Sequence, residues 1–213
     1  MALVPATYGD PSLPVSRDAL APPRPATEVP KGSNLMGTLL VLAADGMVLV
    51  ALLATWFTIK AGTPRWPPSK VSLSTYLPTM VTITAAMSAF SMQWLVSSIK
   101  RNDQRSGAAA AVLTVVLGLA VVNAQWYSMV RAKFGFNAHA YGTLYYLFIG
   151  YHAVHVALGI GAVILVGSRA VAGHFGRKNY DAVRATAALW QYGNAAWAVI
   201  VVVLFLFSPH HHA

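Results

Sequence analysis

The chain has 213 residues, of which 56% are hydrophobic and only 10% are charged. Soluble globular domains carry about 25% charged residues, so this composition excludes an ordinary soluble domain and indicates a membrane protein. Cysteine is absent, which excludes disulfides, thiolate metal sites and cysteine nucleophiles. The net charge of +9 does not indicate a nucleic-acid partner, because basic residues in loops are the ordinary topological signal of a membrane protein.

The chain opens with a proline-rich segment, residues 1–33, which is predicted to be an extended or disordered tail. Five apolar segments follow, and at a rise of about 1.5 Å per residue each can cross a hydrocarbon core of roughly 30 Å. Their expected bounds are 35–59, 76–99, 107–131, 141–167 and 185–207. The pattern predicts an all-α integral membrane protein, with a five-helix transmembrane bundle over residues 34–208 and a short tail over 209–213.

The basic residues predict the direction of these helices. Ten Lys and Arg residues lie in the N-terminal tail and in the second and fourth loops, against five in the first and third loops. Because positive loops stay in the cytoplasm, we expect a cytoplasmic N-terminus and an external C-terminus.

Asp45 is the acidic residue expected near the middle of a span. An ionised carboxylate at that depth costs about 3 kcal/mol on insertion scales, so Asp45 should face protein or be protonated. Its small flanking residues, Ala43, Ala44 and Gly46, permit another helix to pack closely. Two roles stay open for Asp45: a site for protons, a lipid headgroup or a partner, or simple hydrogen bonding between helices.

The other four spans also carry polar side chains, and we expect these to converge in the interior of the bundle. The residues are Gln93, Asn123, Gln125, His152, His155, Gln191 and Asn194. An i, i+3 spacing places His152 and His155 on one helix face, and Gln191 and Asn194 on another. For the amides, plain interhelical hydrogen bonding is the favoured interpretation.

The two central histidines do not predict a redox centre. Two bis-histidine haems would need four histidines within the membrane, and i, i+3 is poor geometry for sandwiching one haem. A metal ion would need further ligands, and no cysteine or acidic cluster supplies them. We therefore expect no cofactor and no metal on this chain. Among the other histidines, His139 lies at a membrane edge, His174 in a loop and the remainder in the last residues of the chain.

The segment YYLFIGYHAVHVALG carries the pattern of an aromatic pair, Gly, an aromatic residue, two histidines three residues apart, Val and a later Gly. The positions that match are Tyr145, Gly150, Tyr151, His152, His155, Val156 and Gly159. In this pattern the chain resembles subunit III of the haem–copper cytochrome c oxidases, in its five-helix bacterial form. The resemblance runs over residues 35–207.

Other segments extend the resemblance and also depart from it. The segment LAADGMVLVALLATWF resembles the family's helix with a buried acid, and Asp45 stands where the family usually has Glu. The RWPP of the first loop and the basic turn of residues 100–105 resemble the corresponding segments of actinobacterial-type members. Gln125 matches a family Gln, but Tyr127 and Ser128 occupy the neighbourhood of a later family Glu. In the last span, Gln191 stands where the family has a His and Asn194 where it has an Asp. Across the whole bundle, the aromatic residues expected to serve packing are Trp56, Tyr151, Trp190 and Trp197.

The resemblance implies a subunit without redox centres in a proton-pumping terminal oxidase of a bacterial cell membrane. Such a subunit packs on catalytic subunit I, whose complex holds the haem and copper, and belongs with subunit II or a larger respiratory supercomplex. It holds phospholipid in a cleft between its first two helices and the remaining three, and supports proton uptake. Three alternatives stay open: a related quinol oxidase or nitric oxide reductase subunit, a free-standing proton-coupled transporter, and a haem-bearing anchor.

Overall fold

The computed structural model describes residues 32–68, 71, 73–176 and 179–206. The expected all-α fold with five long helices is confirmed. The helices are α1 (Ser33–Gly62), α2 (Tyr76–Lys100), α3 (Gln104–Arg131), α4 (Ala140–Val171) and α5 (Asp181–Val201), and the last continues into a π-helical turn, η2 (Val202–Leu206). Each is long and apolar enough to cross a membrane. Apart from residues 32 and 33, the two predicted tails lie outside the described residues.

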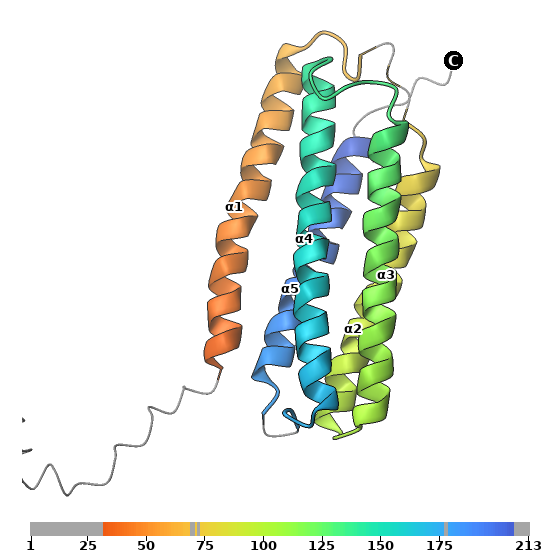
Figure 1. Ribbon diagram of the computed structural model, residues 1–213. Helices are drawn as coiled ribbons and strands as arrows, with labels where there is room; N and C mark the ends of the chain where they lie inside the picture. The colour runs from red at the N-terminus through yellow and green to blue at the C-terminus, as the bar shows by residue number, and fades with distance from the viewer. Residues whose placement is uncertain (1–31, 69–70, 72, 177–178, 207–213) are drawn as a thin grey trace, which may run out of the picture. The chain divides into compact units, whose positions relative to one another are not determined.

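The helices pack in a defined order around α4 and α5 (Figure 1). The most extensive helix contact joins α2 to α3, and α3 in turn packs on α4. On the other flank, α1 packs mainly on α5 and more sparsely on α4. The prediction of a cleft between the first two helices and the remaining three is therefore wrong, because α2 lies against α3 and α5, whereas α1 packs on the other flank against α5 and α4.

Local capping residues define where the helices begin and end. The turn between α2 and α3 is tight: Asn102 has a φ of 58°, and the Asp103 side chain accepts a hydrogen bond from the backbone N–H of Ser106 at 3.0 Å. This cap starts α3 at Gln104, three residues before the expected position. At the end of α4, Gly173 has a φ of 77°, and the backbone hydrogen bonds at this end of the helix form a Schellman motif.

Two apolar clusters form the core. One joins α1, α4, α5 and η2 to the first loop and also includes Val81 and Ala85 of α2 and Val121 of α3, and the other lies between α2, α3, α4 and α5. On α1 only Leu42, Leu49 and Trp56 are buried, seven residues apart, so this helix contacts its neighbours along one narrow stripe. Trp56 ends the stripe in an aromatic cluster, with its ring centroid 4.9 Å from that of Trp66 and 5.2 Å from that of Tyr141.

Polar contacts from α5 to other helices supplement this packing. The Asp181 carboxylate accepts hydrogen bonds from the backbone N–H groups of Asn34 and Leu35 at 3.1 and 3.3 Å. These N–H groups lie in the first turn of α1, where a helix has no internal acceptors. The first residue of α5 thus caps the start of α1.

Candidate functional site

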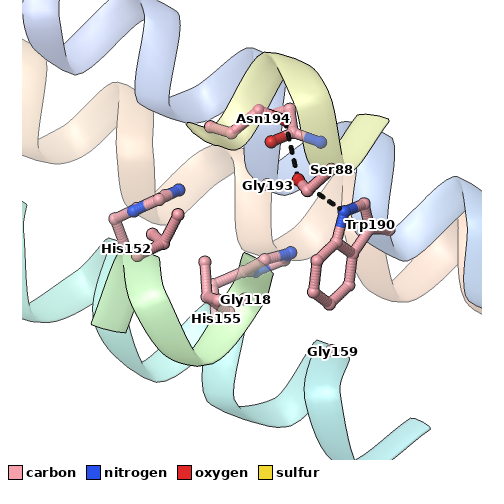
Figure 2. A pocket seen from close by; sticks show the side chains of 11 residues that line it. Ser88, Gly118, His152, His155, Gly159, Trp190, Gly193 and Asn194 are labelled. Carbon is pink, nitrogen blue, oxygen red and sulfur yellow. Dashed lines mark hydrogen bonds between the residues drawn. The ribbon is translucent and has the colours of Figure 1, made fainter. Parts of the chain in front are cut away.

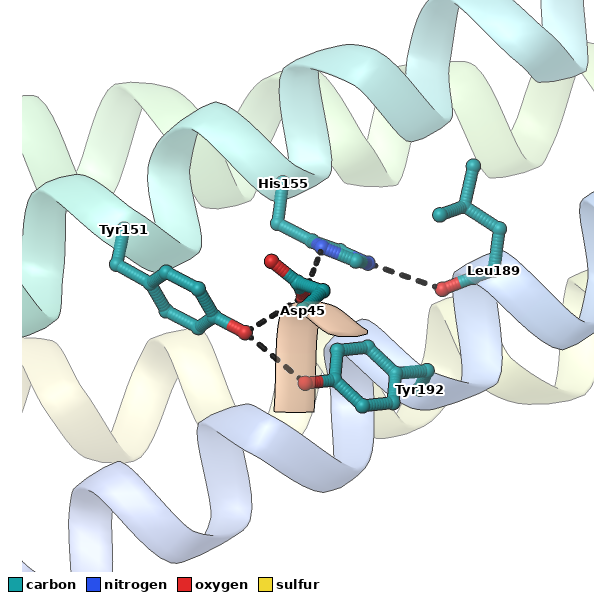
Figure 3. A network of polar contacts seen from close by, with 5 residues as sticks. All are labelled: Asp45, Tyr151, His155, Leu189 and Tyr192. Atoms are coloured by element: carbon teal, nitrogen blue, oxygen red, sulfur yellow. Dashed lines mark hydrogen bonds and ion pairs between the residues drawn. The ribbon is translucent and has the colours of Figure 1, made fainter. Parts of the chain in front are cut away.

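Asp45 lies in a network of polar side chains contributed by α1, α4 and α5 (Figure 3). The Tyr151 hydroxyl donates a hydrogen bond to Asp45 Oδ2 at 2.7 Å, and it lies 3.0 Å from the Tyr192 hydroxyl. His155 Nδ1 lies 3.5 Å from the same carboxylate oxygen. Asp45 therefore faces protein partners, as its position in a span requires.

The protonation pattern of His155 follows from its two neighbours. Its Nε2 lies 3.1 Å from the backbone carbonyl oxygen of Leu189, which can only accept, so Nε2 carries a hydrogen and donates it. Nδ1 is then the nitrogen that faces Asp45. This contact is attractive when one further proton lies either on the carboxyl group or on Nδ1. The Asp45–His155 pair can therefore hold one proton within the membrane span.

Helix geometry explains how the network assembles. Tyr151 and His155 are four residues apart, so both project from the same face of α4. A side chain at Gly46 would place its Cβ 3.6 Å from the Tyr192 hydroxyl oxygen, which shows how closely α1 and α5 approach. Of the three small residues that flank Asp45, only Gly46 faces the neighbouring helix. Ala43 and Ala44 are exposed, so the expectation that another helix packs closely against them is wrong within this chain.

His152 is buried in a different environment from His155, although the two share a helix face. The side-chain amide nitrogen of Gln125 on α3 hydrogen-bonds to His152 Nδ1, and both side chains are about 1% exposed. The imidazole also lies near the Trp197 ring, with centroids 4.8 Å apart. His152 thus connects α4 to α3 and α5, whereas His155 connects α4 to α1 and α5.

The expected polar and aromatic residues of α5 mostly bond to α2. Gln191 Nε2 donates to the backbone carbonyl of Ala89 at 3.0 Å. The indole N–H of Trp190 donates to Ser88 Oγ at 3.1 Å, and that of Trp197 donates to Thr82 Oγ1 at 3.0 Å. Asn194 is half-buried, and its Nδ2 atom has no hydrogen-bond partner among the described residues.

Two residues expected in the interior lie elsewhere. Gln93 on α2 and Asn123 on α3 are exposed, so the prediction that they converge with the other polar residues is wrong. The reason is rotational phase: Met92 and Leu95 supply the buried face beside Gln93, and Val121 and Gln125 supply it beside Asn123.

Several polar residues were missed from the sequence. Tyr192 completes the Asp45 network, and Ser88 and Thr82 accept from the two buried indoles. Ser91 and Thr114 hydrogen-bond between α2 and α3 through their hydroxyl oxygens, 2.8 Å apart. The i, i+3 spacing of Ser88 and Ser91 was the available signal, since it marks one polar face of α2.

Three of the four ring nitrogens of the midspan histidines face other groups of the chain. His155 directs Nε2 to a carbonyl and Nδ1 to Asp45, and His152 Nδ1 is taken by Gln125. Within the described part of the chain, no three His, Cys, Asp or Glu side chains are grouped so that they could hold a metal ion.

The fold and this site define a multi-pass membrane protein whose midspan polar groups bond to one another across helices. The chain belongs to the cytochrome c oxidase subunit III family, whose model matches residues 16–209, and the resemblance noted in the sequence is thus confirmed.

Three relatives illustrate the similarity. Cytochrome c oxidase subunit 3 of Synechocystis sp. is 24% identical over 175 residues, covering 81% of this chain and 75% of that protein. The corresponding protein of Thermostichus vulcanus is 21% identical over 176 residues, covering 82% and 88%. The probable cytochrome c oxidase subunit 3 of Mycobacterium leprae is 28% identical over 174 residues, covering 80% and 86%.

Proposed function

We propose that this chain is the non-catalytic subunit III of a proton-pumping haem–copper terminal oxidase in a bacterial cell membrane. It packs on subunit I, belongs with subunit II or a larger respiratory supercomplex, and supports stability and proton uptake during aerobic respiration. The observation that carries this proposal is the family match, which spans all five helices.

The haem and copper of this complex are assigned to partner subunits. Both nitrogens of His155 and Nδ1 of His152 face protein groups, which supports a structural use of these side chains. The five helices supply contacts and a polar interior, while electron transfer takes place in subunits I and II.

The proton-related part of the proposal rests on the Asp45–His155 pair. The 3.5 Å separation of the carboxylate oxygen from Nδ1, together with the Leu189 carbonyl at Nε2, supports a site that holds one proton. In an oxidase that takes protons up from one side of the membrane, such a site would help to keep protons available to the partner subunit.

Phospholipid binding is supported by a groove between α3 and α4. The groove has a volume of about 330 Å³ and is lined almost entirely by apolar side chains, including Ala108, Val112 and Ile164. Arg105 lies one helical turn before Ala108, so its cation is placed on the same helix side to meet a lipid phosphate. An acyl chain is the proposed occupant.

Native mass spectrometry of the purified complex tests the lipid. Val112→Trp, which fills the groove, should release one phospholipid, whereas Leu119→Trp, at an exposed α3 position outside the groove lining, should not. Equal lipid retention in both variants would argue against this groove.

Purification tests the function as a whole. The tagged full chain, extracted in mild detergent, should bring down a partner with the absorption spectrum of haem and with bound copper. Comparing reduced cytochrome c with quinol as donor then distinguishes a cytochrome c oxidase from a related quinol oxidase, and a nitric oxide assay tests for the reductase. Recovery of a colourless, stable homo-oligomer would refute the proposal.

A free-standing proton-coupled transporter is the second candidate, and the Asp45–His155 pair is the observation that favours it. Liposomes that contain this chain alone decide between the two. Proton-coupled flux that is lost in Asp45→Asn would favour the transporter, and its absence favours the oxidase subunit. Soret absorption by the isolated chain would instead indicate a haem-bearing anchor.

A further inference from the structure

A small cavity lies between α2, α3, α4 and α5, beside the two midspan histidines (Figure 2). The space open to the centre of a water-sized sphere measures about 10 Å³. On that measure, about 10–15 Å³ is the room that one water molecule needs. The walls include His152, His155, Trp190 and Asn194.

Glycines and rings give this cavity its shape. A Cβ at Gly118 would lie 2.7 Å from Trp190 Cη2, and a Cβ at Gly193 would lie 2.8 Å from His155 Cδ2. The aromatic rings therefore fill the notches that the glycines leave. Since the rings are held by hydrogen bonds to Ser88 and to the Leu189 carbonyl, the remaining space does not close by a simple side-chain rotation.

Two polar atoms at the cavity lack a hydrogen-bond partner among the described residues. Gln125 Nε2 donates to His152 Nδ1, so His152 carries its hydrogen on Nε2, and that atom is buried without a hydrogen-bond partner among the described residues. The Gly193 backbone approaches the ring but does not meet hydrogen-bond geometry at Nε2. Asn194 Nδ2, a second donor, is also buried and unpartnered within the described chain.

These donors select the chemistry of the occupant. A metal ion needs a nitrogen lone pair, whereas His152 Nε2 presents a hydrogen. An anion would lose its hydration in a cavity whose wall is mostly apolar. A water oxygen has two lone pairs for N–H donors and two hydrogens for acceptors, and buried waters typically satisfy polar groups of this kind.

We propose that this cavity holds one ordered water molecule, which accepts a hydrogen bond from His152 Nε2 and lies within reach of Asn194. The water supplies the partner that the imidazole lacks and joins α4 to α5. Because His155 borders the cavity and also faces Asp45, the polar interior extends from Gln125 on α3 to Asp45 on α1.

Water-edited solid-state NMR on the intact complex, with the chain labelled with ¹⁵N-histidine, tests the proposal. The Nε2–H of His152, assigned by its loss in His152→Gln, should receive magnetisation from water at short mixing times. A density map that resolves other buried waters should show a peak within hydrogen-bond distance of Nε2. No transfer to Nε2–H, or an empty cavity in such a map, would overturn the proposal.

Two alanine variants on α2 provide the matched control. Ala85 lines the cavity, whereas its neighbour Ala86 is exposed on the helix surface. Ala85→Val fills the cavity and should abolish the water transfer to His152, and Ala86→Val should leave it unchanged. Undiminished transfer in a folded Ala85→Val complex would show that the water lies elsewhere and refute the site.

Discussion

Tyr151→Phe should weaken the attachment of α1 to the bundle. The variant keeps the ring and loses two hydrogen bonds: the one to Asp45 at 2.7 Å joins α4 to α1, and the one with the Tyr192 hydroxyl at 3.0 Å joins α4 to α5. Interhelical hydrogen bonds in membrane proteins contribute about 0.6 kcal/mol on average and at most about 1.7. Two such bonds, one of them to a carboxyl group, predict a loss of about 1–2 kcal/mol in the free energy of unfolding.

The narrow contact surface of α1 makes this loss measurable. Only Leu42, Leu49 and Trp56 are buried along its length, so little apolar packing compensates for the missing hydrogen bond to Asp45. The free energy of unfolding is measured in mild detergent for Tyr151→Phe, Asp45→Asn and the double variant. The coupling energy of this cycle isolates the Tyr151–Asp45 contact.

Tyr127→Phe serves as the control, because Tyr127 is exposed on α3 and its ring, which contacts the Arg131 guanidinium, is kept. The reasoning fails if Tyr151→Phe costs no more than this control. It also fails if the effects of Tyr151→Phe and Asp45→Asn are simply additive.

Two further predictions concern packing and pH. Gly118→Ala should lower the free energy of unfolding by about 1–3 kcal/mol, because the new Cβ would lie 2.7 Å from a Trp190 ring carbon. In the same unfolding assay, Gly161→Ala should stabilise α4 by about 0.5–1 kcal/mol, because no atom of another helix lies within 4 Å of the Cβ that it adds. Hydrogen bonds with the Ser106 side chain and backbone hold the pKa of Asp103 in the folded chain below its usual 3.8. The carboxylate therefore stabilises the fold fully above pH 3.8, and this stabilisation is lost as the pH falls through the lower pKa of the folded state. Asp103→Ala should therefore lower the melting temperature at pH 7, and the difference from the unmodified chain should vanish in strong acid; a deficit that persists there would contradict the linkage.

The five spans could be predicted because a transmembrane helix is a matter of length and apolarity, both of which the sequence displays. Their ends were less predictable, since they depend on local hydrogen bonds. Asp103 caps α3 before its apolar run begins. The last turn of α4 includes Arg169, beyond the expected end of the span, and Gly173 then ends the helix in a left-handed conformation. Hydropathy also gives no sign of the π-helical turn that follows Val201.

The site was predictable in its members and less so in its partners. Asp45, His152 and His155 are conspicuous because ionisable groups are costly in a span. For uncharged residues the signal is weaker, because the lipid-facing and the buried sides of a transmembrane helix are both apolar. Gln93 and Asn123 show the consequence: periodicity could not tell that they face outward.

The attachment of α1 shows why partners need the structure. Lipid is as apolar as a leucine side chain, so apolar area alone does not direct a helix to a particular neighbour in a membrane. α1 instead meets the bundle at three specific places: its first turn at Asp181, its middle at Asp45, and its last turns at the aromatic cluster around Trp56. Tyr192 acquires its role in the second of these because Gly46 leaves room for its hydroxyl. That role depends on two helices far apart in the chain having the right rotation and depth, which neither helix's own sequence specifies.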